Sequence, residues 1–490
     1  MKKNNNSIKT LGELIKSGYQ SNSIKHEIRK NLITKLSSKE KLFEGIYGYD
    51  KTVIPDLQRA LLSEHNILFL GLRGQAKTRI ARQICTLLND EIPIIAGSEL
   101  NDDPLNPISA YGKKMVAQLG DQTPIEWINR TDRYVEKLAT PDVSVSDLIG
   151  DIDPIKAVNQ KLSFADEQSI HYGLIPRSNR SIFVINELPD LQPRIQVSLY
   201  NILQEGDIQI RGFKVRLPLD LLFLFTANPE DYTNRGSIIT PLKDRIDSQI
   251  LTHYPTDLET AMTITAQEAR VKPEEKNIFI PPLLKVLLEQ ISFEARSSEL
   301  VDINSGVSAR LGISAYENLI SAVERRMLKN NESSGTARLS DFVGVMPAIT
   351  GKVELVYEGE QLGPYKVAFE LLNKALKTEF LKHFPHPEKL KKNERDPYGV
   401  IKAWFAGEHE LKMAVDATQP VYEESLNQVS GLERLVKAMP VVETDRPVYK
   451  ELVLHGLAAF NLLNKELHQT RFEFSDLLGD LGEKDEEVDD

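Results

Sequence analysis

The fold of this chain is decided by residues 67–78, which read ILFLGLRGQAKT. The apolar start predicts a short buried strand, the two glycines predict a tight loop, and helical spacing of apolar residues follows over 79–88. A loop that joins a strand to a helix N-terminus directs backbone N–H groups toward one point, where they bind phosphate oxygens. Lys77 would neutralise charge at the β- and γ-phosphates, and the Thr78 hydroxyl would reach Mg2+. The stretch predicts a phosphate-binding loop for a nucleotide; the alternative is an ordinary strand-turn-helix corner that ends in Lys-Thr.

One residue of this loop departs from the usual pattern. Phosphate-binding loops generally carry glycine at the position of Ala76. A Cβ there lies where the backbone often approaches the phosphate closely, so we expect weaker binding or a slightly shifted pose. The residues expected to contact the nucleotide are Gly71, Leu72, Arg73, Gly74, Gln75, Ala76, Lys77 and Thr78.

A second decisive stretch, residues 181–187, reads SIFVINE. A strand that is apolar on both faces is typical of a covered parallel sheet, with polar groups at its carboxyl-terminal edge. In phosphate-loop ATPases such a strand usually ends in Asp-Glu, where the Asp holds a Mg2+-bound water and the Glu polarises the attacking water. Here the pair is Asn186 and Glu187, so the candidate base is intact. An amide can accept a hydrogen bond from a metal-bound water but adds no negative charge, so we expect reduced Mg2+ affinity at Asn186.

Other polar residues stand at the ends of predicted strands. Asn228 follows the apolar run 221–226, and its amide would orient the attacking water if that strand lies beside residues 181–187. The alternative is a turn residue, because Asn228 precedes a proline. Asp102 and Asp103 also precede a proline, and we interpret them as turn caps in preference to metal ligands.

Two arginines are candidates for contact with the γ-phosphate. Arg245 is a candidate for an arginine that a neighbouring subunit supplies to the γ-phosphate. A guanidinium suits this role because it spreads over transition-state charge in a way that an ammonium cannot. Its alternative is a salt bridge with Asp244 or Asp247. Arg310 stands at the start of a predicted long helix, where the helix dipole disfavours a cation unless a phosphate is near. Its alternative is a plain surface arginine.

Length and composition limit the classes of function. A chain of 490 residues exceeds one core and suggests about three domains at roughly 150 residues each. A net charge of −11 gives no overall electrostatic footprint for nucleic acid. The single cysteine, Cys85, excludes an intrachain disulfide and a cysteine metal cluster, and we expect it in the core. Residues 1–6 lack a signal-peptide core and the strongest apolar run, 221–225, is strand-sized, so we expect a cytoplasmic protein without membrane contact.

With these residues in order, the chain resembles the AAA+ ATPases, in the branch of magnesium-chelatase ATPase subunits and MoxR-type proteins. The resemblance spans residues 41–350. It implies an αβα nucleotide domain, a helical lid, and assembly into a ring of usually six copies, with ATP at each subunit interface. The matching positions beyond the loop and residues 181–187 are 97–104, 147–153 in the helix-2 insert, 173–175, the hairpin 208–217, Asn228 as sensor 1, Arg245 as arginine finger and Arg310 as sensor 2.

The resemblance also sets the domain organisation and the partners that we expect. The fold class is α/β, with a mainly helical C-terminal region whose spacing predicts helices at 367–376, 403–415, 421–439 and 452–467. Ring remodelers of this branch commonly work with a protein partner that carries a von Willebrand A domain, and some drive metal insertion into a client. The expected segments are an N-terminal helical segment at 1–40, the nucleotide domain at 41–255, the lid at 256–350, the C-terminal region at 351–478 and an acidic tail at 479–490.

The first hypothesis for function is an ATP-hydrolysing hexameric ring that remodels a protein partner, with partner specificity in residues 351–490. The second is a nucleotide-gated assembly scaffold with little hydrolysis, which Ala76 and Asn186 would allow. A third class, a ring that acts on DNA, shares the insert architecture with some helicases. The acidic charge and the lack of a zinc-binding domain or a GAFTGA loop argue against it.

Overall fold

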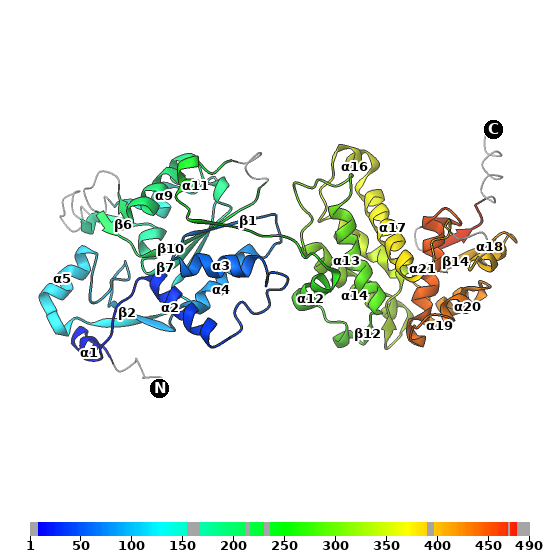
Figure 1. Cartoon of the computed structure of the whole chain (residues 1–490), viewed down its shortest axis with the longest axis horizontal. Helices are drawn as coiled ribbons and strands as arrows, with labels where there is room; N and C mark the ends of the chain where they lie inside the picture. The colour runs from blue at the N-terminus through cyan, green and yellow to red at the C-terminus, as the bar shows by residue number, and fades with distance from the viewer. Residues whose placement is uncertain are drawn as a thin grey trace. The chain divides into compact units, whose positions relative to one another are not determined.

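The computed structural model describes residues 8–153, 167–210, 216–229, 236–389, 396–468 and 471–477. The chain divides into two units, Met1–His253 and Tyr254–Asp490, whose elements are labelled along the chain in Figure 1. Every described helix is too short or too polar to cross a lipid bilayer.

A five-stranded parallel sheet forms the centre of the first unit. β7 and β10 have neighbours on both sides and are buried along their whole length, which explains their continuous apolar runs in the sequence. The α/β fold that the sequence predicts is therefore confirmed. The strands, in spatial order, are β11 (Ser248–Leu251), β1 (Ile67–Leu70), β10 (Leu221–Ala227), β7 (Ser181–Asn186) and β4 (Tyr134–Leu138).

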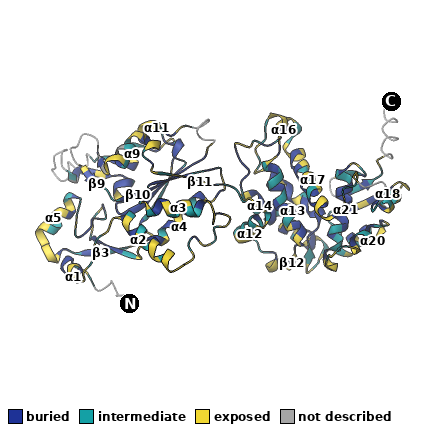
Figure 2. Ribbon diagram, viewed as in Figure 1, coloured by how far each residue is buried: buried dark blue, intermediate teal, exposed yellow. Residues whose placement is uncertain are grey.

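Side chains alternate between the two faces of this sheet, and each face has its own hydrophobic core. Ile67 and Phe69 of β1 join the core beneath α2, α3 and α4, whereas Leu68 joins the core beneath α9 and α11. Figure 1 shows these helices on opposite faces of the sheet, and Figure 2 shows the strands between them buried. The helices are α2 (Ile24–Ser37), α3 (Val53–Leu62), α4 (Lys77–Ile84), α9 (Pro193–Glu205) and α11 (Thr240–Asp244).

One predicted strand forms outside the central sheet. The run at 92–95 is part of β2 (Glu91–Ile95), which pairs antiparallel with β3 (Ile125–Asn129) in a two-stranded sheet. The strand beside β7 is β4, which no sequence pattern revealed. An edge strand is paired along one side only, and β4 carries Glu136 and Lys137 near its centre, so no continuous apolar run marks it.

Two antiparallel pairs form where the sequence predicts an insert and a hairpin. Each pair is a two-stranded sheet separate from the central one. The tip of the hairpin, residues 211–215, lies outside the described residues. The remaining elements of the first unit include α1 (Leu11–Lys16), α5 (Ala110–Leu119), α6 (Val145–Leu148), β5 (Gly150–Ile152) paired with β6 (Ile170–Tyr172), α8 (Leu174–Arg177), and β8 (Asp207–Gln209) paired with β9 (Arg216–Pro218).

The second unit is built mainly from helices around one hydrophobic core. Leu287 and Leu319, before residue 350, belong to the same buried cluster as Leu371 and Leu452 after it. A truncation at residue 350 would therefore expose this core. The elements are α12 (Leu258–Glu268), β12 (Ile278–Phe279), α13 (Pro282–Arg296), α14 (Arg310–Asn330), β13 (Gly335–Thr336), α15 (Met346–Thr350), α16 (Tyr357–Leu362), α17 (Pro364–His383), α18 (Gly399–Phe405), β14 (Leu411–Ala414), α19 (Gln419–Gln428), α20 (Leu432–Lys437), α21 (Arg446–Ala459), β15 (Asn464–His468) and β16 (Arg471–Ser475).

Three of the predicted C-terminal helices differ from the structure. The segment 403–415 is the end of α18 followed by β14, and 452–467 is the end of α21 followed by β15. β14, β16 and β15 form an antiparallel sheet, and β14 alternates buried and exposed side chains. In so short a window this alternation cannot be told from helical spacing. The segment 421–439 is two helices, separated around Gly431, which has a φ of +95°.

Candidate functional site

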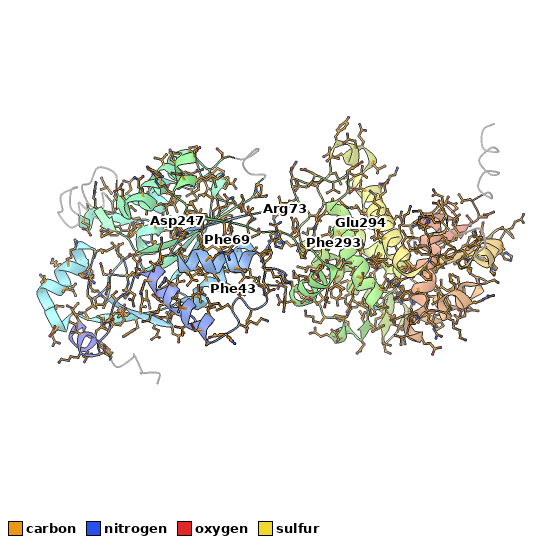
Figure 3. The ribbon with its side chains drawn as sticks, viewed as in Figure 1. Phe43, Phe69, Arg73, Asp247, Phe293 and Glu294 are labelled. Carbon is orange, nitrogen blue, oxygen red and sulfur yellow. The ribbon has the colours of Figure 1, made fainter. Side chains whose placement is uncertain are left out.

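The loop between β1 and α4 encloses the side chain of Lys77. Lys77 is only 8% exposed, and its ammonium donates to the carbonyl oxygens of Gly71 and Leu72, at 3.0 Å for Leu72. The Tyr49 hydroxyl donates to the carbonyl oxygen of Gln75 at 2.9 Å and so ties the loop to the segment before α3. Figure 3 labels Arg73 of this loop and Phe69 of the strand before it. The lysine charge therefore lies inside the loop that the sequence predicts to bind phosphate.

Ala76 shows why this position usually carries glycine. It is the N-cap of α4, with φ +57° and ψ +15°, which is the left-handed region. That conformation costs an L-residue about 1–2 kcal/mol, and glycine adopts it freely. The backbone conformation is thus a reason for glycine in addition to the close approach of a phosphate.

The carboxyl ends of β1, β7 and β10 bring several of the predicted residues together, because parallel strands end at the same edge of a sheet. The Thr78 hydroxyl lies 3.5 Å from Oδ1 of Asn186. The Thr226 hydroxyl donates to the same Oδ1 at 3.1 Å and accepts from the backbone N–H of Glu187 at 3.1 Å. Glu187 itself turns the chain out of β7 with a φ of +56°. The loop and the Asn-Glu pair are therefore neighbours in space.

Asn228 lies one residue beyond β10, next to the loop, since Gly71 donates to the carbonyl oxygen of Ala227 at 3.2 Å. β10 and β7 are adjacent, which is the condition on which its predicted role beside Glu187 depends. Asn228 is 8% exposed, and its Oδ1 has no hydrogen-bond partner among the described residues. A buried acceptor without a donor costs about 1–3 kcal/mol. A bound water or ligand group would remove that cost, so the edge fits the predicted nucleotide.

Sequence reasoning missed Glu136. This β4 residue accepts from Nδ2 of Asn186 at 2.6 Å, although the two lie 50 positions apart in the chain. Arg82, on α4, also donates to it, with 3.0 Å between Nε and Oε2. The pKa of Arg82 is raised, chiefly by its hydrogen bond to Glu136. No local pattern marks Glu136, because its contact with Asn186 depends on the order of the strands.

Arg245 follows α11 of the first unit, and Arg310 begins α14 of the second. In the chain itself Arg245 follows α11, forms an ion pair with Asp244 and lies 5.4 Å from the centre of the Tyr200 ring on α9. The salt-bridge alternative is thus what one copy shows, with Asp244 as the partner; Asp247 instead accepts from a backbone N–H. Arg310 is the exposed first residue of α14 in the second unit, and in the described part of the chain its guanidinium has no hydrogen-bond or ion-pair partner.

The paired acids Asp102 and Asp103 cap turns, as the sequence indicates. Oδ1 of Asp102 accepts from the backbone N–H groups of Ile108 at 2.7 Å and Ser109 at 2.9 Å, and Asp103 accepts from that of Leu105 at 3.0 Å. Over the described ranges, no three His, Cys, Asp or Glu side chains are grouped so as to hold a metal ion. A Mg2+ ion at the loop would then depend on the nucleotide's own phosphates for ligands, as is usual for this ion.

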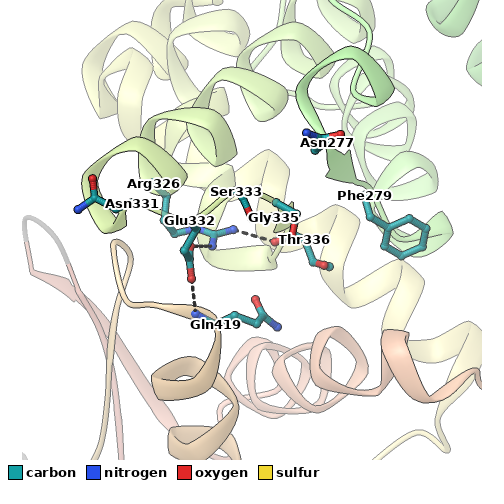
Figure 4. A pocket seen from close by; sticks show the side chains of 10 residues that line it. Asn277, Phe279, Arg326, Asn331, Glu332, Ser333, Gly335, Thr336 and Gln419 are labelled. Carbon is teal, nitrogen blue, oxygen red and sulfur yellow. Dashed lines mark hydrogen bonds and ion pairs between the residues drawn. The ribbon is translucent and has the colours of Figure 1, made fainter.

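A cavity of about 530 Å3 lies in the second unit, at the end of α14 beside β12 and β13 (Figure 4). Arg326 lines it, is 1% exposed and forms an ion pair with Asp341 at 3.1 Å. Glu332 lies 3.8 Å from Arg326 and also accepts from the backbone N–H of Gln419 at 3.1 Å. Because these two carboxylates neutralise the arginine, we assign no anionic ligand to this cavity.

Comparisons with known proteins return structures only. No family profile matches the sequence, and no curated protein is found as a relative. NtrX from Brucella abortus is 14% identical over 60% of this chain, with a TM-score of 0.35, and the chain spans 55% of NtrX. A complex between subunits BchI and BchD of magnesium chelatase is 18% identical over 65% of this chain and 98% of its own, with a TM-score of 0.33. A candidate ATPase from Cytophaga hutchinsonii is 17% identical over 72% of this chain and 96% of its own, with a TM-score of 0.29.

The magnesium-chelatase branch that the sequence resembles is represented among these neighbours. Identities of 14–18% with TM-scores of 0.29–0.35 assign no activity, substrate or partner to this chain.

Proposed function

We propose that this chain binds and hydrolyses ATP with Mg2+ as a subunit of an AAA+ ring that remodels a protein partner. The observation that supports this most directly is that several groups meet at one edge of the sheet. They are the loop around Lys77, the Asn186–Glu187 pair and Oδ1 of Asn228, which has no hydrogen-bond partner among the described residues. The sequence resemblance to magnesium-chelatase ATPase subunits and MoxR-type proteins supports the ring and the partner.

Each residue of the edge has a distinct task in this proposal. The backbone N–H groups of the loop and the Lys77 ammonium bind the phosphates. Thr78 holds Mg2+, which when bound neutralises phosphate charge. Glu187 takes the proton of the attacking water, and Asn228 orients that water through its free Oδ1.

Arg245 acts on the site of a neighbouring copy. Its side chain is 36% exposed and pairs with Asp244, which is 69% exposed. An exposed ion pair is worth about 0–1 kcal/mol, so Arg245 can leave Asp244 for a γ-phosphate at little cost. We propose a ring of six copies, with Arg310 sensing the nucleotide from the lid. The C-terminal region, residues 351–490, contacts the partner, and that partner carries a von Willebrand A domain.

The test is ATP hydrolysis by the full chain over a range of protein concentrations. Glu187→Gln should lower turnover by about 10²–10⁴-fold while ATP still binds, as expected for loss of a general base. Arg245→Ala should lower it by about 10³-fold or more. The matched controls are Glu126→Gln and Arg59→Ala, which change exposed residues of the same unit and should leave turnover unchanged.

Mixing the two inactive variants tests whether sites are shared. In a head-to-tail ring assembled at random, about a quarter of the interfaces would pair an intact Glu187 with an intact Arg245, so activity should partly return. No recovery, with both variants still assembled, would contradict action between subunits. Full activity of Glu187→Gln would refute the catalytic assignment.

The second candidate is a nucleotide-gated scaffold, which the neutral Asn186 favours. Tight ATP binding and concentration-dependent assembly, with negligible hydrolysis at every concentration, would support the scaffold over the ATPase.

A further inference from the structure

The side-chain amide of Asn186 is held in one orientation. Its Nδ2 lies 2.6 Å from Oε1 of Glu136, and a carboxylate can only accept, so the NH2 group must face Glu136. Oδ1 therefore faces the hydroxyls of Thr226 at 3.1 Å and Thr78 at 3.5 Å. The amide of Asn186 thus contacts the carboxylate of Glu136 through Nδ2 and the hydroxyl of Thr78 through Oδ1.

Asn186 and Glu136 fit each other in charge. An aspartate at position 186 would place a second carboxylate at hydrogen-bond distance from Glu136, and two such groups cannot both ionise freely. With asparagine at position 186, the site has one negative charge, and this charge lies on Glu136 of β4 and not at the end of β7. The neutral residue at the end of β7 and the charged residue in β4 are therefore two parts of one arrangement.

Glu136 also pairs with Arg82, and this contact offers a purely structural role. Arg82 donates to both carboxylate oxygens of Glu136, from Nε at 3.0 Å and from Nη2 at 3.3 Å, but its side chain is 64% exposed, so solvent screens this ion pair. Glu136 itself is 23% exposed and accepts in addition from the Tyr134 hydroxyl at 3.3 Å. The contact with Arg82 is weak enough to yield when a cation arrives beside Thr78.

We propose that Glu136 of β4 supplies the negative charge that supports Mg2+ beside Thr78. It does so in place of the acidic residue that usually stands at the end of the strand corresponding to β7, where this chain has Asn186. This inference rests on the proposed nucleotide site. Glu136 acts in two ways: it adds the charge that Asn186 lacks, and it fixes the Asn186 amide so that Oδ1 faces Thr78. Glu136 is a positioning residue. Its role is therefore tested by the dependence of nucleotide binding on Mg2+ concentration and not by the rate of catalysis.

The test measures binding of a fluorescent ATP analogue, mant-ATP, to the full chain, in EDTA and over a range of Mg2+ concentrations. Glu136→Gln keeps the size of the side chain and removes its charge. It should weaken Mg2+ affinity of the nucleotide complex about 10–100-fold, the usual effect of losing a group that supports a metal ligand. Affinity in EDTA should stay the same. Mn2+ binding, counted by EPR with ATP present, should fall in parallel.

The double variant Glu136→Gln with Asn186→Asp returns the charge to the end of β7 and keeps a hydrogen bond between the two side chains. It should restore Mg2+ affinity. Arg82→Gln is the control for the structural role and should not weaken Mg2+ affinity.

Each outcome bears on a different claim. Wild-type Mg2+ dependence in Glu136→Gln, or equal loss in Arg82→Gln, would overturn the role of Glu136 and leave the proposed function standing. Loss in Glu136→Gln without recovery in the double variant would overturn the exchange of charge between the two positions. Failure of the wild-type chain to bind mant-ATP with or without Mg2+ would overturn the proposed function, and this inference with it.

Discussion

Replacement of Ala76 by glycine should stabilise the first unit, although alanine to glycine normally destabilises a protein. Ala76 has φ +57° and ψ +15°, and leaving this left-handed strain recovers about 1–2 kcal/mol. Glycine also makes the unfolded chain more flexible, which costs about 0.4–1 kcal/mol. The net gain in unfolding free energy is then about 0–1.6 kcal/mol, and its midpoint of about 0.8 kcal/mol corresponds to a rise in Tm of roughly 2 °C for a unit of this size.

The measurement is urea unfolding followed by tryptophan fluorescence. The chain has two tryptophans, and a Trp404→Phe background leaves Trp127 on β3 as a reporter of the first unit alone. The matched control is Ala117→Gly, an exposed position within α5, where the same substitution should cost about 1 kcal/mol. Equal destabilisation by Ala76→Gly and Ala117→Gly would show that Ala76 is not left-handed in solution and would refute the reasoning.

Two further predictions concern buried charges of the first unit. Glu27→Gln should lower the unfolding free energy of this unit by about 3 kcal/mol, because it leaves a buried arginine charge unpaired. Glu27 and Arg133 are 5% and 1% exposed and form two hydrogen bonds of 2.8 Å. A loss below about 1 kcal/mol in urea unfolding would contradict this. Burial raises the pKa of Asp220 from 3.8 to about 6, so the folded unit binds a proton that the unfolded chain has released, and this group lowers stability as pH rises from about 4 to about 6. Asp220→Asn should therefore stabilise the unit more at pH 7 than at pH 4, by roughly 2–3 kcal/mol, and an equal effect at both pH values would refute the assignment.

The core of the fold followed from local sequence patterns. The runs at 67–70, 181–186 and 221–227 are apolar on both faces because their strands lie inside a covered sheet. The edge strand β4 has no such run. The pattern predicted β2 as a strand but did not show that it pairs with β3 in a separate sheet. The helix predictions at 403–415 and 452–467 were wrong because a period of two and a period of 3.6 residues cannot be told apart over a few residues.

In the candidate site, too, some features follow from contiguous sequence and others depend on packing. The loop at 71–78 and the pair Asn186–Glu187 are contiguous in sequence, and their chemistry follows from residue type and spacing. Their roles in nucleotide binding and catalysis, and those of Arg245 and Arg310, remain predictions. That Oδ1 of Asn228 has no hydrogen-bond partner among the described residues is a property of packing, which no spacing encodes.

The sequence by itself determined which strands are central, where the predicted phosphate-binding loop lies and that Asn186 lacks the usual charge. Only the tertiary structure decided that Glu136 stands 2.6 Å from that asparagine and that Ala76 is left-handed. The physical reason is that hydrophobic periodicity records burial and backbone hydrogen bonding along one segment. The contact between β4 and β7 depends on strand order, and strand order is set by how all the segments pack together.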